Sequence, residues 1–95
     1  MIYLLILTYT APMEEVDKLL PAHRLYLDKN YAAGHFIASG RQNPRTGGII
    51  LCRAGSRSQT EQIIHEDPFN AIATYQIIEF EPSKCIAGLE SILLE

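Results

Sequence analysis

His23 and Asp67 are the residues whose chemical types point most directly to acid–base chemistry, and each occupies an unusual place. His23 falls on the apolar stripe of an expected helix, and Asp67 stands where a helix gives way to a proline-anchored turn. A carboxylate that reaches an imidazole fixes its tautomer and raises its basicity, which makes a general acid/base at neutral pH. The sequence therefore predicts a His–Asp pair, provided that the fold brings these two distant positions together.

Both residues also have a purely structural interpretation. A histidine on an apolar helix face is more often a hydrogen-bonded core residue than a catalyst, and Asp67 before Pro68 is also suited to stop a helix or form an Asx turn. The other two histidines belong to no motif. His35, directly after Gly34, is expected at an exposed strand start, and His65 lies in the last turn of a helix, where a cation suits the dipole.

Hydrophobic periodicity predicts the elements that position His23. Ile2–Tyr9 is apolar on both alternating faces, which is typical of a central strand covered on each side. A helix is expected from Met13 to the cap at Gly34, and its apolar stripe at helical spacing consists of Val16, Leu19, Leu20, His23, Leu27 and Tyr31. Pro21 removes a backbone donor inside this stretch, so two segments at a kink are favoured over one rod.

The second half of the chain predicts strands on either side of a short helix. Ser58–Glu61 has the pattern of a capping box that opens a helix running through His65, and Asp67-Pro68 stops it. Residues 83–95 predict no definite conformation. The expected strands, two of which form a hairpin across the turn residues 43–47, are His35–Gly40, Gly48–Arg53 and Ala71–Glu81.

This order, β-α-β-β-α-β, predicts an α+β fold of the ferredoxin-like kind, with a four-stranded antiparallel sheet and both helices on one face. His23 and Asp67 then lie on the same side of the sheet, where they can meet. The first strand is apolar on both faces, so the uncovered face needs a partner. A second copy related by a two-fold axis is the default, and we expect a homodimer packed sheet on sheet.

Composition limits the class of protein. The 95 residues are expected to form one domain, 1–95, with 47% hydrophobic and 20% charged residues, as in ordinary globular proteins. A net charge of −3 without a basic cluster argues against nucleic acid as partner, and the mid-chain arginines suit a local anion contact better. No basic leader and no run of about 18 apolar residues is present, so we expect a cytoplasmic protein without a membrane partner.

Other chemistries find little support in the sequence. Cys52 and Cys85 have neither disulfide-scaffold nor metal-ligand spacing, and we expect both to be reduced and mostly buried. There is no nucleophile elbow, and Gly47-Gly48 lacks the helix start that a phosphate-binding loop needs. The three histidines are not spaced to hold a metal. We therefore expect no cofactor and no metal site.

A family resemblance rests on several of these residues in order. Pro21-Ala22-His23-Arg24-Leu25-Tyr26-Leu27, Gly34, Ala38-Ser39-Gly40, Gly47-Gly48 and Glu66-Asp67-Pro68-Phe69 together resemble the YCII (YciI-like) family, from Met1 to about Pro82. The resemblance implies a dimeric α+β barrel and an active site centred on a His–Asp pair, here His23 and Asp67. It also implies small-molecule lyase or dehydrohalogenase chemistry on hydroxylated aromatics, and related barrels include muconolactone isomerases.

The chain departs from this pattern after the second expected strand. Many relatives have Ser-Gly-Pro where this chain has Ser39-Gly40-Arg41. These three residues are candidate substrate-binding positions, with Arg41 facing an anionic group such as a carboxylate or phenolate. A solvated loop arginine is the alternative for Arg41, and Ser39 either donates to a ligand or only ends a strand.

Three functional hypotheses follow. The first is a cofactor-independent lyase or isomerase, or a dehydrohalogenase-like enzyme, with His23 as general acid/base oriented by Asp67 and a small polar or hydroxylated aromatic substrate. The second is a non-enzymatic dimer that binds a small ligand, anionic or aromatic, or has a regulatory role. The third is a structural dimer in which His23 and Asp67 are only a buried hydrogen-bonded pair. The sequence does not identify the substrate.

Overall fold

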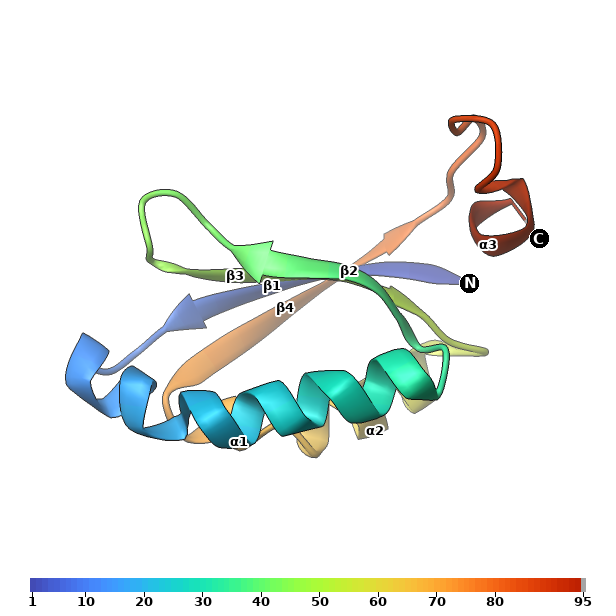
Figure 1. Cartoon of the computed structure of the whole chain (residues 1–95). Coiled ribbons are helices and arrows are strands. Elements are labelled where there is room, and N and C mark those ends of the chain that lie inside the picture. The colour runs from blue at the N-terminus through green and yellow to red at the C-terminus, as the bar shows by residue number, and fades with distance from the viewer. Residues whose placement is uncertain (95) are drawn as a thin grey trace.

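The computed structural model describes residues 1–94, and its elements follow the predicted order (Figure 1). Two helices alternate with four strands, and a 3-10 helix precedes the last strand. The elements are β1 (Ile2–Tyr9), α1 (Met13–Ala32), β2 (Phe36–Arg41), β3 (Gly47–Arg53), α2 (Arg57–His65), the 3-10 helix η1 (Pro68–Ala71), β4 (Ala73–Phe80) and the short α3 (Glu90–Leu93).

The four strands form one antiparallel sheet in the order β2-β3-β1-β4. In the central strand, Leu5 pairs with Ile50 of β3 on one side and with Ile77 of β4 on the other. Helices α1 and α2 lie on the same side of this sheet (Figure 1). The predicted ferredoxin-like α+β fold is therefore confirmed.

The two faces of the sheet differ in how they are covered. On the helix side, Tyr3, Leu5 and Leu7 alternate along β1 and are almost completely buried. On the other side, Ile2 is buried near the C-terminal segment, but Leu4 and Ile6 are only half-buried. Neighbouring strands continue this second surface with Ile49, Ile78 and Phe80, which are 39%, 40% and 47% exposed. One face of the sheet is thus apolar and open.

The predicted break of the first helix at Pro21 is wrong, because α1 is one continuous helix from Met13 to Ala32. A proline inside a helix costs about 3 kcal/mol through a lost hydrogen bond and a steric clash. Here Val16 before it, and His23 and Tyr26 after it, are all buried on the same side of the sheet. Burial of both halves holds the helix together across Pro21, which itself faces solvent.

The second helix begins earlier than predicted. Its N-cap is Ser56, whose Oγ accepts a hydrogen bond from the Gln59 backbone N at 3.1 Å, and Ser58 lies inside the first turn. The Gln59 side chain reaches back to accept from the Gly55 backbone N at 2.6 Å. The capping box is therefore Ser56–Gln59, two residues before the expected one.

The ends of the last strand also differ from the prediction. Pro68–Ala71 form η1, so β4 starts at Ala73 instead of Ala71 and ends at Phe80. After β4 the chain has little regular structure until α3, and residue 95 lies outside the described part. Within residues 1–94, no helix has both the length and the apolar character needed to cross a membrane.

Candidate functional site

His23 is placed by the buried face of α1. Val16, His23, Tyr26 and Asn30 form that face, and His23 is only 8% exposed. The sequence predicted Tyr31 on the buried stripe, but Tyr31 is 40% exposed and Tyr26 takes the buried place. The Tyr26 hydroxyl donates to the backbone O of Ile63 at 2.7 Å, which ties α1 to α2 three residues after His23.

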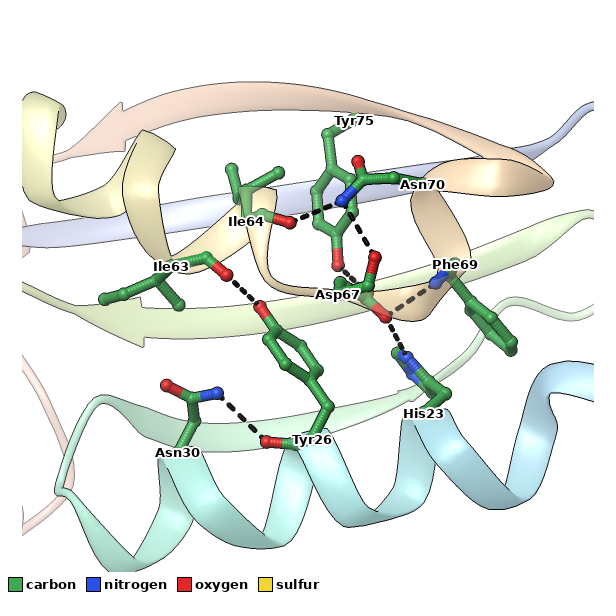
Figure 2. Close-up of polar contacts among 9 residues, drawn as sticks. All are labelled: His23, Tyr26, Asn30, Ile63, Ile64, Asp67, Phe69, Asn70 and Tyr75. Atoms are coloured by element: carbon green, nitrogen blue, oxygen red, sulfur yellow. Dashed lines mark hydrogen bonds and ion pairs between the residues drawn. The ribbon is translucent and has the colours of Figure 1, made fainter.

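Asp67 caps η1 and faces His23 from there. Its Oδ1 accepts from the Phe69 backbone N at 2.9 Å, which is an Asx-type cap, and lies 2.8 Å from His23 Nδ1 (Figure 2). Asp67 is 3% exposed. One oxygen of Asp67 therefore makes both the helix cap and the contact with His23.

The tautomer of His23 follows from this contact. An ionised carboxylate only accepts hydrogen bonds, so the Nδ1 atom must carry the hydrogen that it donates to Oδ1. In the neutral ring, the proton is then on Nδ1 and the free lone pair is on Nε2. This is the arrangement in which a histidine base is oriented by a carboxylate behind it.

Tyr75, from β4, completes the surroundings of the carboxylate. Its hydroxyl donates to Asp67 Oδ2, the oxygen that His23 does not use (Figure 2). Burial, and then the negative charge of Asp67, raise the pKa of Tyr75 far above its usual value, so its hydroxyl stays protonated as a donor. The sequence predicted Tyr75 only as a residue of the expected strand Ala71–Glu81, with no part in the site. The available signal was that a buried tyrosine hydroxyl needs a hydrogen-bond partner.

Phe69 fixes the plane of the imidazole. Its ring stacks on His23 with the centroids 3.8 Å apart and 3° between the planes. Tyr9 meets the edge of Phe69 at 6.0 Å. Asn70 anchors the same turn, because its side-chain N donates to the backbone O of Ile64 at 2.7 Å and of Asp67 at 2.8 Å. The ring of His23 is thus held both at Nδ1 and across one face.

His23 opens onto a pocket of about 400 Å³ between α1 and the sheet. The predicted substrate-binding residues Ser39, Gly40 and Arg41 all line it, so the structure brings them to the same pocket as His23. The Ser39 Oγ lies 2.7 Å from the Tyr31 hydroxyl. The remaining lining residues combine apolar walls with charged groups: Leu7, Tyr9, Asp17, Leu20, Arg24, Leu27, Arg45, Gly48, Ile49, Ile50 and Phe69.

The charged groups of the pocket are mostly cationic. Arg45 is paired with Asp17 at 2.9 Å, and this hydrogen bond raises the pKa of the Arg45 guanidinium. Arg24 and Arg41 form no ion pair with any residue in 1–94. Arg24 follows His23 directly in the sequence but was not predicted as a site residue. Two cations over apolar walls suit a small ligand with an anionic group.

The other titratable candidates lie elsewhere. His35 Nδ1 is 3.4 Å from the backbone O of Arg53, and His65 is exposed at the end of α2. Cys52 and Cys85 are free thiols; Cys52 is buried, as predicted, whereas Cys85 is half-exposed. Burial raises the pKa of Cys52 to about 11, which disfavours the reactive thiolate. Residues 1–94 bring together no group of three or more potential metal ligands.

Comparison with known proteins supports the fold and identifies the family. No curated protein matches the chain. Among solved structures, the chain is similar to 5-chloro-2-hydroxyhydroquinone dehydrochlorinase from Burkholderia phenoliruptrix, solved in complex with 2,5-dihydroxybenzoquinone. The TM-score is 0.71 at 18% sequence identity, covering 84% of this chain and 93% of that one. The YCII-related domain matches residues 1–81, and the chain therefore belongs to the YCII-related family.

Proposed function

We propose that this protein is a small-molecule enzyme in which His23 is the general acid/base and Asp67 orients it. The observation that carries the proposal is the 2.8 Å contact between His23 Nδ1 and Asp67 Oδ1, with the histidine at the wall of a pocket. A positioned general acid/base of this kind contributes about 10²- to 10⁴-fold in rate.

The proposed reaction is a proton transfer that leads to elimination or isomerisation. His23 Nε2 takes a proton from a substrate carbon or hydroxyl, and Asp67 stabilises the imidazolium that forms. In an elimination, the electron pair of the broken C–H or O–H bond forms a new double bond, and the bond to the leaving group breaks with its electron pair going to that group. The imidazolium then releases its proton to solvent. In an isomerisation, the imidazolium returns the proton at another position. Both reactions are redox-neutral, so neither requires a cofactor.

The proposed substrate is a small polar or hydroxylated aromatic molecule. The apolar walls suit a ring, Arg41 suits a carboxylate or phenolate, and Ser39 with the Gly40 backbone suits a polar substituent. One solved structure of similar fold is a 5-chloro-2-hydroxyhydroquinone dehydrochlorinase. Halide elimination from hydroxylated aromatic rings is therefore the first reaction class to assay.

We further propose that the protein is a cytoplasmic homodimer that packs sheet on sheet. The open face of the sheet carries exposed Ile49, Ile78 and Phe80 beside half-buried Leu4 and Ile6. Contiguous apolar surface of this kind marks an interaction site, and a two-fold contact would cover both copies at once. The free thiols of Cys52 and Cys85 suit a reducing compartment.

The central test is turnover and binding by His23→Gln and Asp67→Asn, with His65→Gln as the matched control on an exposed histidine. A panel of halogenated hydroquinones and hydroxylated lactones serves as substrate. We expect the site variants to lose about 10²- to 10⁴-fold in kcat and the control to match the unmodified protein. Unmodified protein that binds these ligands through His23 but turns none over would support the non-enzymatic binding alternative instead.

The substrate-binding part is tested with Arg41→Gln against Arg57→Gln. Arg57 is an exposed arginine of α2 that pairs with Glu61 at 3.1 Å and does not belong to the pocket lining. We expect Arg41→Gln to weaken binding of benzoate-type anions about tenfold or more and to leave neutral phenols unaffected. Equal losses for both ligand classes would contradict the anion contact.

A further inference from the structure

We propose that Tyr75 is a positioning residue that acts on His23 through Asp67. By holding Oδ2, Tyr75 fixes the carboxylate of Asp67 in the orientation that keeps Oδ1 within hydrogen-bond distance of His23 Nδ1, and this contact keeps the proton on Nδ1 and the lone pair on Nε2. Its effect on the tautomer depends on the geometry alone, whereas its effect on catalysis rests on the proposed function of His23.

The argument starts from the division of partners on the carboxylate. Oδ1 accepts from the Phe69 backbone N and from His23, and Oδ2 accepts from the Tyr75 hydroxyl (Figure 2). With Asp67 almost fully buried, both oxygens need donors, since an unsatisfied buried acceptor is strongly unfavourable. Without the Tyr75 hydroxyl, Oδ2 would lack a donor and the carboxylate would turn to find one, which would weaken the contact between Oδ1 and His23 Nδ1 and let the proton move to Nε2.

The secondary-structure elements that carry Tyr75 and Asp67 explain why their hydrogen bond fixes the orientation of the carboxylate. Asp67 stands at the start of a four-residue 3-10 helix, whereas Tyr75 lies within β4, where it pairs with Leu7 of the central strand. The hydroxyl therefore ties a short turn to the rigid sheet. The carboxylate of Asp67 thus connects the His23 imidazole, the η1 turn and the sheet. The Phe69 ring stacks on one face of the imidazole.

A neutral donor suits this place. A lysine or arginine in the same position would cancel the charge of Asp67 and weaken its attraction for an imidazolium. The Tyr75 phenol donates a hydrogen bond without adding charge, and it remains a donor because burial and the neighbouring carboxylate raise its pKa. The pair thus keeps the negative charge that a protonated His23 requires.

The test compares Tyr75→Phe with Tyr3→Phe. Both changes delete one tyrosine hydroxyl on the helix side of the sheet, from half-buried Tyr75 and from buried Tyr3. The Tyr3 hydroxyl contacts the Met1 sulfur at 3.4 Å and not Asp67. The first readout is the ¹⁵N spectrum of the imidazole nitrogens of His23 in neutral protein. We expect one tautomer, with the proton on Nδ1, in the unmodified protein and in Tyr3→Phe.

In Tyr75→Phe we expect ¹⁵N shifts that average between the two tautomers. A pure Nδ1–H tautomer in Tyr75→Phe would overturn the proposal, whether or not the protein shows any turnover.

The second readout is kinetic. Because Tyr75 is not among the pocket-lining residues of the described chain, kcat should fall about 10- to 100-fold with KM nearly unchanged. A changed KM with an unchanged kcat would contradict a positioning role.

A measurement on the unmodified protein covers the case in which Tyr75→Phe does not fold. With ¹³C-labelled tyrosine, the Tyr75 hydroxyl proton should be seen as a slowly exchanging, downfield resonance, and Asp67→Asn should shift it. A Tyr75 hydroxyl that exchanges as fast as that of an exposed tyrosine would overturn the proposal. If the unmodified protein turns over no substrate but the ¹⁵N spectra show the expected tautomers, the proposed function is contradicted and the positioning role of Tyr75 is still supported.

Discussion

The His23 ring is buried as a core residue is, and its Nδ1 atom contacts a carboxylate as in a histidine that acts as a base. Phe69 covers one face at 3.8 Å, and Asp67 holds Nδ1 at 2.8 Å, yet the ring still reaches the pocket wall. A side chain held at two points loses little freedom when a substrate arrives, which is what preorganisation requires. The burial that makes His23 look structural is therefore also what would make it an accurately placed base.

The buried thiol of Cys52 gives a pH effect on stability with a definite sign. Burial raises its pKa from the ordinary 9.0 to about 11. At a pH between 9.0 and about 11, the Cys52 thiol has lost its proton in the unfolded protein but retains it in the folded protein. Unfolding then releases a proton, and the free energy of unfolding falls as the pH rises, by up to about 1.4 kcal/mol per pH unit from this group.

Urea unfolding at several pH values from 8 to 11 measures this slope. We expect Cys52→Ala, although less stable at every pH, to lose stability more slowly between pH 9 and 11 than the unmodified protein. Cys85→Ala, which changes a half-exposed thiol, should keep the original slope. If the free energy of unfolding falls equally with pH in Cys52→Ala and Cys85→Ala between pH 9 and 11, the burial of Cys52 does not control the loss of stability at alkaline pH.

At the scale of the elements, the α2 cap shows where sequence patterns reach their limit. Ser56-x-x-Gln59 and Ser58-x-x-Glu61 both fit a capping box, and the first one forms. The start at Arg57 gives a nine-residue helix with Thr60, Ile63 and Ile64 buried on one side. The sequence predicted a helix running through His65, but its pattern does not decide which of the two possible caps begins that helix.

The cap assignment has a direct test in Ser56→Ala and Ser58→Ala. Removing the N-cap hydroxyl should lower the free energy of unfolding by about 1 kcal/mol, because the Gln59 N–H loses its partner. Ser58 is exposed inside the helix, where alanine has the higher propensity, so that change should be neutral or slightly stabilising. Urea unfolding of the two variants at pH 7 measures the difference, and equal losses would contradict Ser56 as the cap.

The site was predictable to the extent that topology determines it. The β-α-β-β-α-β order places both helices on one side of the sheet, and from this the approach of His23 and Asp67 followed. The stack of Phe69 and the hydroxyl of Tyr75 depend on side-chain distances between η1, α1 and β4, which hydrophobic spacing does not encode. The continuity of α1 through Pro21 likewise depends on burial on either side of it.

At the scale of the whole molecule, the sheet separates two different surfaces. The helix side contains the core and the pocket, and the other side presents apolar residues that neither α1 nor α2 covers (Figure 1). A chain of this length buries only about 60–65% of its unfolded surface, so covering the open face with a second copy adds a substantial share of the total burial. This is the physical reason to expect that folding and dimerisation support each other.

The proposed dimer makes the last prediction, through Ile78→Glu on the open face and Leu25→Glu on the helix layer. Both change an exposed apolar residue into a carboxylate, with Ile78 40% and Leu25 71% exposed in the single chain. Sedimentation equilibrium should give twice the chain mass for the unmodified protein and for Leu25→Glu. Ile78→Glu should sediment as a monomer, because two carboxylates would be buried against each other or against apolar side chains across a two-fold contact. An unmodified protein that stays monomeric at micromolar concentrations would contradict the dimer, and an Ile78→Glu variant that stays dimeric would place its interface elsewhere.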